Sequence, residues 1–137
     1  YARVYGHLKA AVEELASALE ARGQKVSVFD LARDDMAEAV EDAFRYDRLV
    51  LASITYQGEI FPFMSTFIHT LAEHAYQNRT VALVEAGSWA PTAAKVMTKE
   101  LEGMKDITLA QNKVTVLGSL NDASRAQIEV LADELSK

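Results

Sequence analysis

Two kinds of apolar pattern alternate along this chain of 137 residues, and the alternation restricts the fold more than any other feature. Short β-branched runs are typical of strands, and those at 49–54 and 81–84 are nearly continuous, as in strands that are covered on both faces. Similar runs lie at 26–29 and 114–117. Between these runs, apolar residues recur every three or four positions, which indicates helices with one buried face. The pattern therefore predicts helices and strands in turn.

Each predicted helix carries one apolar stripe, and residues that start or stop helices lie at the edges of these stripes. The stripes are Leu8, Val12, Leu15 and Leu19; Met36, Val40 and Phe44; Met64, Phe67 and Leu71; Val96, Met97, Leu101 and Met104; and Ile128, Leu131 and Leu135. Gly23, a residue suited to the left-handed conformation, follows the first stripe. Capping side chains precede the second stripe, at Asp34 or Asp35, and the last stripe, at Asn121 or Asp122. Pro62 and Pro91 stand near the starts of the third and fourth helices.

Strict alternation of this kind predicts an α/β fold of three layers, a parallel sheet with helices on both faces. Residues 1–137 contain no linker, repeat or low-complexity stretch, so a single domain is expected. The strand that should precede the first helix is reduced to Tyr1 to Val4 at most, whereas strands usually have about five to six residues. We therefore expect a truncated first strand in a fragment of a longer multidomain protein, or a gap that a partner chain fills.

Composition excludes several functional classes. The chain has no cysteine, which excludes disulfide scaffolds, thiolate metal sites, iron–sulfur clusters and cysteine nucleophiles. Its 20 acidic and 14 basic residues give a net charge of -6, which argues against a nucleic-acid partner. No apolar run approaches the roughly 20 residues that span a bilayer, and the start lacks a signal-peptide pattern. We expect a cytoplasmic protein without a membrane partner.

Ligands of open α/β sheets bind at the carboxyl ends of the strands, which directs attention to the loops at 3–8, 55–62 and 86–92. In the first loop, Gly6 would let the backbone approach an anion at a helix N-terminus. A single glycine is a weak signal, so a plain tight turn remains the alternative.

Two large aromatic residues, Tyr56 and Trp89, follow directly after buried strands in the second and third loops. Aromatic side chains at such positions either cover the sheet edge or stack on a planar ligand. Their place beside an anion site favours a planar phosphorylated ligand.

No catalytic or metal site emerges from the sequence. A phosphorelay receiver would need an acidic residue at the end of the 49–54 run and a lysine after 114–117, but Ser53, Thr55 and Gly118-Ser119 stand there. His69 and His74 are five residues apart and do not share a helical face at metal-pair spacing. No Ser/His/Asp constellation is found either.

In these loops the sequence resembles the flavodoxin family, and more narrowly the C-terminal flavodoxin domain of flavodiiron proteins, the A-type flavoproteins. The resemblance extends over essentially the whole chain, and the third loop is its most specific part. The residues that carry it are Val4-Tyr5-Gly6-His7, Thr55-Tyr56, Ile60-Phe61-Pro62, Gly87-Ser88-Trp89-Ala90-Pro91-Thr92-Ala93, and the turn Asp30-Leu31-Ala32-Arg33-Asp34-Asp35.

The resemblance implies a site for FMN. The first loop would cradle the phosphate, and the other two would enclose the isoalloxazine ring, with Tyr56 and Trp89 as its neighbours. The cofactor-binding residues implied are Arg3, Val4, Tyr5, Gly6, His7, Leu8, Thr55, Tyr56, Gln57, Gly58, Gly87, Ser88, Trp89, Ala90, Pro91 and Thr92.

The resemblance also implies a function, an electron carrier that feeds the diiron site of a flavodiiron oxygen or nitric oxide reductase. The diiron domain would lie upstream, outside this chain, and the donor would be rubredoxin-like or NAD(P)H-dependent. The resemblance to flavodiiron proteins also implies that the protein could form a homo-oligomer. Arg3 and Leu8 stand where the family usually has hydroxyl side chains. The alternative is therefore a cofactor-poor module that acts in assembly or docking. A third option is a stand-alone NAD(P)H-dependent flavin reductase, which is less favoured because the sequence shows no nicotinamide site.

Overall fold

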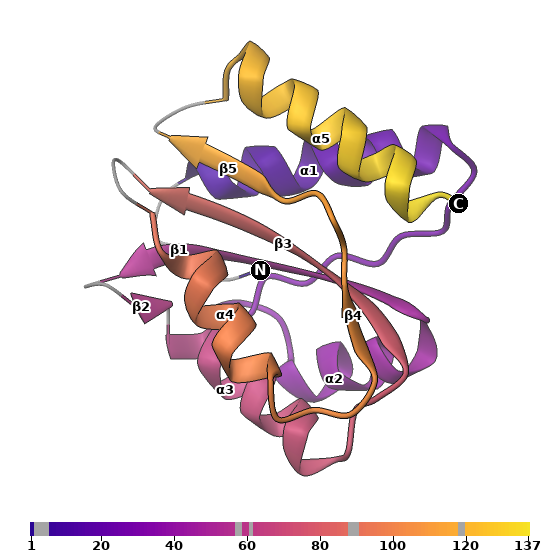
Figure 1. The fold of residues 1–137 in the computed structure, drawn as a ribbon, viewed down its shortest axis with the longest axis vertical. Coiled ribbons are helices and arrows are strands. Elements are labelled where there is room, and N and C mark those ends of the chain that lie inside the picture. The colour runs from indigo at the N-terminus through magenta and orange to yellow at the C-terminus, as the bar shows by residue number, and fades with distance from the viewer. Residues whose placement is uncertain (2–5, 57–58, 61, 88–90, 118–119) are drawn as a thin grey trace.

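The computed structural model describes residue 1 and residues 6–56, 59–60, 62–87, 91–117 and 120–137 (Figure 1). Helices and strands follow one another along most of this length. In chain order they are α1 (Gly6–Ala21), α2 (Met36–Arg45), β1 (Arg48–Tyr56), β2 (Glu59–Ile60), α3 (Pro62–Glu73), β3 (Arg79–Gly87), α4 (Ala93–Leu101), β4 (Ile107–Leu109), β5 (Val114–Leu117) and α5 (Asp122–Leu135).

The described strands form one sheet between two layers of helices. β1 pairs with β3 in parallel, and β3 pairs in parallel with β4 and β5 along its other edge. The two-residue β2 pairs antiparallel with the end of β1. Helices α1 and α5 cover one face, and α2, α3 and α4 cover the other (Figure 1). The predicted three-layer α/β architecture is confirmed.

The register places the ends of the three longest parallel strands at one edge of the sheet. Ile54 of β1 is level with Ala86 of β3, and Ala86 is level with Val116 of β5. The arrowheads of all three strands therefore lie together, beside the start of α1 (Figure 1). Loops that follow these strands leave the sheet from this one edge, which we call the carboxyl edge.

The predicted helix boundaries are confirmed where capping residues set them. Gly23 follows α1 with a φ of +82°, in the left-handed region that glycine enters at little cost. The Asp35 side chain accepts a hydrogen bond from the Ala37 N–H at the start of α2. Asn121 and Ser124 form a reciprocal capping box at the start of α5.

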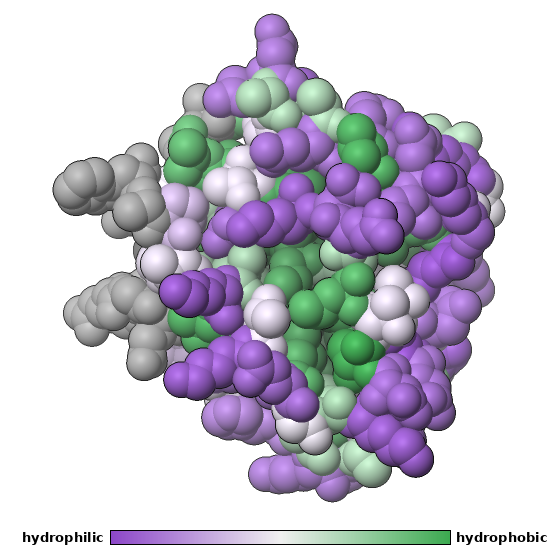
Figure 2. All heavy atoms as spheres, viewed as in Figure 1, coloured by the Kyte–Doolittle hydropathy of each residue, from purple (hydrophilic) through white to green (hydrophobic). Residues whose placement is uncertain are grey.

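Two apolar clusters fill the space between the layers. Leu8 and Leu15 of α1 pack with Leu131 of α5 on one face, and Phe67 of α3 packs with Met97 of α4 on the other. The outer faces of the helices are polar, and Figure 2 shows apolar side chains gathered between α4 and α5, over β4. Burial of these clusters supplies the main driving force for folding.

Helix α2 departs from its predicted stripe. Its fully buried residues are Ala39 and Ala43, whereas Met36, Val40 and Phe44 are half-buried. The small alanine side chains face the apolar cluster, and the larger residues lie along the flank of the helix, partly packed against that cluster.

The predicted strand at 26–29 is extended but belongs to no strand of the described sheet. Its backbone contacts Tyr1 instead, because the Tyr1 amine donates to the Phe29 carbonyl at 2.7 Å and the Leu31 N–H donates to the Tyr1 carbonyl at 2.9 Å. Strands β2 and β4 were not expected; with two and three residues they are too short to show a period.

Candidate functional site

The sixteen residues predicted to bind a cofactor come from three predicted loops, whose described parts lie at the carboxyl edge. Eight of them lie outside the described residues: Arg3, Val4, Tyr5, Gln57, Gly58, Ser88, Trp89 and Ala90. Of Gly6 and Tyr56 the structure describes the backbone. The other six, His7, Leu8, Thr55, Gly87, Pro91 and Thr92, define the base of the candidate site.

Helix α1 begins at this edge with Gly6. His7 is exposed, whereas the Leu8 side chain is 1% exposed and packs into the apolar cluster beneath α1. Any contact of Leu8 with a ligand is therefore limited to its backbone. The first turn of α1 contains no acidic residue, so no carboxylate in that turn counters the positive potential of its N–H groups and of the helix dipole.

Thr55, near the end of β1, connects the base of the second loop to that of the third. Its Oγ1 accepts hydrogen bonds from the N–H groups of Thr92 at 2.8 Å and Ala93 at 3.1 Å. These donors belong to the N-terminus of α4, where backbone N–H groups lack partners within the helix. The hydroxyl of Thr55 thus caps α4 from the neighbouring strand and fixes the point at which the third loop ends.

Gly87 ends β3 at a place where a side chain would be crowded. A Cβ atom there would lie 3.2 Å from the Cβ of Pro91 and 3.9 Å from the Cβ of Thr55. Pro91, where the described chain resumes, therefore lies close to the end of β3. Glycine permits this approach of backbone to side chain.

A buried carboxylate, Glu85, supports the same region and was missed in the sequence. Its side chain accepts from the Ala94 N–H at 3.0 Å and from the Thr115 hydroxyl at 2.8 Å, and Lys113 Nζ lies 3.4 Å from it. Glu85 is 3% exposed, so these partners compensate a charge that is withdrawn from water. An acidic residue directly after the buried run 81–84 was the signal that could have revealed it.

The helix starts at the carboxyl edge differ in their ability to accept an anion. Thr55 and Glu85 occupy the first N–H groups of α4, and α5 has its own capping box with Asp122 in the first turn. Pro62 at the start of α3 has no N–H. Among the described residues, α1 is therefore the helix at this edge whose N-terminus best suits a phosphate.

Within the described part of the chain, no group of three or more histidine, aspartate or glutamate side chains is placed to hold a metal ion. The same residues contain no helix that is both long and apolar enough to cross a membrane.

Neither protein-family models nor curated protein sequences match this chain. Solved structures do. Rubredoxin oxygen:oxidoreductase from Desulfovibrio gigas matches 99% of this chain and 34% of its own length, with a TM-score of 0.92 and 16% identity. A flavo-di-iron protein variant from Thermotoga maritima matches 98% and 34%, with a TM-score of 0.84 and 22% identity. A flavodoxin from the domain Archaea matches 98% and 91%, with a TM-score of 0.84 and 16% identity.

These likenesses establish a flavodoxin-like fold over essentially the whole chain. The chain spans about a third of the length of the two larger proteins and corresponds to nearly all of the archaeal flavodoxin.

Proposed function

We propose that this flavodoxin-like chain binds FMN at its carboxyl edge and transfers electrons. The observation that carries the proposal is the junction of the second and third loops beside the start of α1. Thr55 bonds to Thr92 and Ala93, and Pro91 lies close over Gly87, so the bases of both loops form one unit. The names of the matched structures, flavodoxins and flavo-di-iron proteins, support FMN as the ligand.

In this proposal the start of α1 holds the phosphate. Backbone N–H groups at Gly6, His7 and Leu8 would donate to the phosphate oxygens, and the helix dipole adds about 0.3–1 kcal/mol for each charge held there. Arg3 would pair with the phosphate through its guanidinium, whose planar shape suits such contacts. Leu8 contributes apolar packing beneath the site, because its side chain is buried.

The second and third loops would enclose the flavin ring, with Tyr56 and Trp89 beside it. FMN, when bound, accepts and donates electrons, and the protein adjusts this property through stacking, hydrogen bonds and nearby charge. Hydrogen bonds to the Thr55 hydroxyl and the Glu85 carboxylate hold the loop bases in place, and the close approach of Pro91 to Gly87 adds to this. The net charge of -6 would disfavour a more negative cofactor, although salt screens it beyond about 8 Å.

The share of each neighbour that this chain covers supports a proposal for its wider role. Because the chain spans 34% of the flavo-di-iron protein, we propose that it passes electrons to a diiron domain of a flavodiiron oxidoreductase. A rubredoxin-like or NAD(P)H-dependent protein would be the donor, in the cytoplasm, and the parent protein would form a homo-oligomer. A free-standing carrier is the second candidate, because the chain covers 91% of the archaeal flavodoxin.

Titration with FMN and with riboflavin tests the proposal, because riboflavin lacks the phosphate. We expect one FMN per chain, quenching of flavin fluorescence, a shift of the visible bands and at least about tenfold weaker binding of riboflavin, equivalent to about 1.4 kcal/mol. A folded protein that leaves the spectra of both flavins unchanged would contradict the proposal and favour a cofactor-poor docking module.

A further inference from the structure

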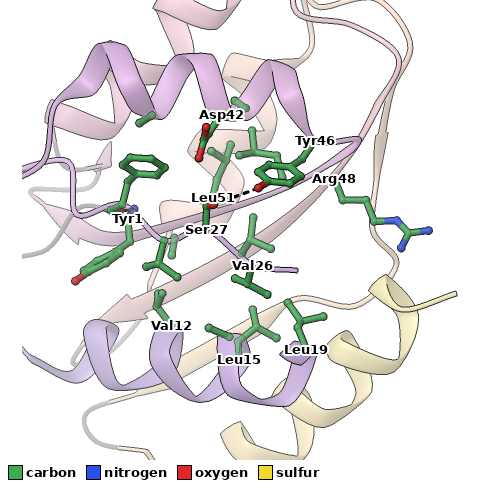
Figure 3. Close-up of a pocket in the computed structure, with 18 of the residues that line it drawn as sticks. Tyr1, Val12, Leu15, Leu19, Val26, Ser27, Asp42, Tyr46, Arg48 and Leu51 are labelled. Carbon is green, nitrogen blue, oxygen red and sulfur yellow. Dashed lines mark hydrogen bonds between the residues drawn. The ribbon is translucent and has the colours of Figure 1, made fainter. Parts of the chain in front are cut away.

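The two sides of the described sheet differ in what lies beside them. Next to β1 is an internal groove of about 340 Å³, bordered by the extended residues 24–29 and by α1 and α2. Figure 3 shows Val12, Leu15 and Leu19 pointing toward this groove from α1. On the far side of β3, the outermost strands of the described sheet are β4 and β5. We call β4, residues 110–113 and β5 together the outer strand.

The outer strand is interrupted by extra residues. Val81 of β3 is level with Leu109 of β4. Three positions later, Val84 is level with Val114 of β5, which lies five positions after Leu109. The two surplus residues lie within 110–113, which belong to no strand. Such a bulge bends an edge and interrupts the row of backbone groups with which another strand could pair.

Two side chains of α5 occupy backbone donors of the outer strand. The Glu134 carboxylate accepts from the N–H groups of Gln111 at 2.8 Å and Asn112 at 3.0 Å, and from the Asn112 side-chain amide at 2.8 Å. The side-chain oxygen of Gln127 accepts from the Thr115 N–H at 2.8 Å. The N–H of a strand residue lies in the plane of the sheet, so a donor that bonds to α5 is not available to an added strand.

The contact of Glu134 with the bulge is a strong one. Partial burial raises the pKa of the Glu134 carboxyl, but the hydrogen bonds from Gln111 and Asn112 outweigh this effect and hold that pKa below its ordinary value. Glu134 is therefore ionised at neutral pH, and hydrogen bonds to an ionised acceptor are stronger than those between neutral groups. Gln127 and Glu134 are seven residues apart, which places them two turns apart on one side of α5.

Exposed apolar side chains accompany the outer strand. Leu109 of β4, Leu117 of β5 and Val130 of α5 are 37%, 52% and 48% exposed. Val130 lies three residues after Gln127 and four before Glu134, so it shares their side of α5. Figure 2 shows apolar side chains gathered between α4 and α5, over β4. Apolar surface beside a sheet edge favours association between chains.

We propose that Glu134 and Gln127 guard the outer strand and prevent a second copy of this chain from pairing with it. The excluded partner is a second copy, because a twofold axis would bring the same apolar edge of two chains together in antiparallel order. The inference is independent of FMN binding, since it rests on hydrogen bonds of α5 to residues 111–115 and not on the loops of the candidate site.

The experiment compares the unchanged chain with the double variant Gln127→Ala/Glu134→Ala. Asp133→Ala is the matched control, because it changes the net charge equally but removes an acceptor that faces Arg22 of α1. Hydrogen exchange and sedimentation velocity are measured over about a hundredfold range of protein concentration. In the dilute double variant, we expect the amides of Gln111, Asn112 and Thr115 to exchange about tenfold faster.

At high concentration, we expect the double variant alone to dimerise, with residues 107–117 becoming protected from exchange as the dimer forms. The dimer should dissociate at an at least about tenfold higher concentration in the unchanged chain and in Asp133→Ala. Adding Leu109→Lys to the double variant should abolish the dimer, because a lysine at a sheet edge opposes pairing. General destabilisation of the chain would not be corrected by that substitution.

A double variant that exchanges faster but gains no protection at high concentration would overturn the proposal. So would equal association of Asp133→Ala, or an unchanged chain whose residues 107–117 are already protected by dimerisation. If the double variant does not fold, Glu134→Gln carries the test, because it removes the charge and keeps one acceptor oxygen. It should show the same two changes to a smaller degree, and exchange at Gln111 and Asn112 equal to that of the unchanged chain would contradict the proposal.

Discussion

Replacing Thr55 by valine tests the cross-strand cap of α4. Valine keeps the shape of threonine but removes the oxygen that accepts from the Thr92 and Ala93 N–H groups at 2.8 and 3.1 Å. Loss of a capping side chain typically costs about 1 kcal/mol, within a range of about 0.5–2. Two donors are affected here, and Thr55 is half-buried, so water replaces the lost bonds only in part. We expect a loss of about 1–2 kcal/mol.

This loss converts into a measurable shift of the unfolding midpoint. At about 2.1 cal/mol/K per residue, a chain of 137 residues has an unfolding entropy of ~0.29 kcal/mol/K, so Thr55→Val should lower the midpoint by about 3–7 °C. Thermal and urea unfolding followed by circular dichroism measure it. Thr55→Ser should retain most of the stability, because it keeps the hydroxyl.

A matched control is Thr70→Val, because the Thr70 hydroxyl donates to the Thr66 carbonyl on an exposed face of α3. That change should stay within about 0.5 kcal/mol, as surface substitutions usually do. If Thr55→Val and Thr70→Val had equal effects, or if Thr55→Ser were as unstable as Thr55→Val, the cap of α4 would not depend on the Thr55 oxygen.

Three further predictions follow from the same structure. Glu85→Leu should cost about 2–4 kcal/mol in urea unfolding, because the N–H of α4 and the hydroxyl of β5 lose their acceptor, while Glu85→Gln should cost less. Gly87→Ala should weaken FMN binding about tenfold in a fluorescence titration, because its Cβ would meet Pro91 at 3.2 Å; Gly103→Ala, with nothing within 4 Å, should leave it unchanged. Stability should rise by about 2–3 kcal/mol between about pH 6 and pH 8, because the buried Tyr1 amine is neutral in the folded chain while the unfolded chain still binds the proton; urea midpoints of the N-terminally acetylated chain should lack this rise.

Periodicity predicted the parts of the fold that local burial determines. The stripe that includes Leu8 and Leu15 and the continuous run 81–84 are buried as expected, because each depends on one face of one element. The segment 26–29 has the composition of a strand but lies outside the described sheet, since a strand also requires a neighbour with free backbone groups. At that place the described chain supplies one residue, Tyr1.

The support of the candidate site was harder to predict, because it depends on contacts between distant residues. Thr55 was expected to bind a cofactor, and the structure shows its hydroxyl bonded to residues 37 and 38 positions later. Glu85 joins α4 and β5 across the sheet, which no local pattern reveals. The roles of Tyr56 and Trp89 beside a flavin ring stay predictions from the sequence.

The central claim is that FMN binds at the carboxyl edge, and amide chemical shifts of the ¹⁵N-labelled protein during an FMN titration test it most directly. We predict that the largest shifts occur at Gly6, His7 and Leu8 and around Gly87 and Thr92, with the first three much less affected by riboflavin. Chemical-shift changes confined to residues 24–29 and 48–52, or no changes at saturating FMN, would contradict the claim.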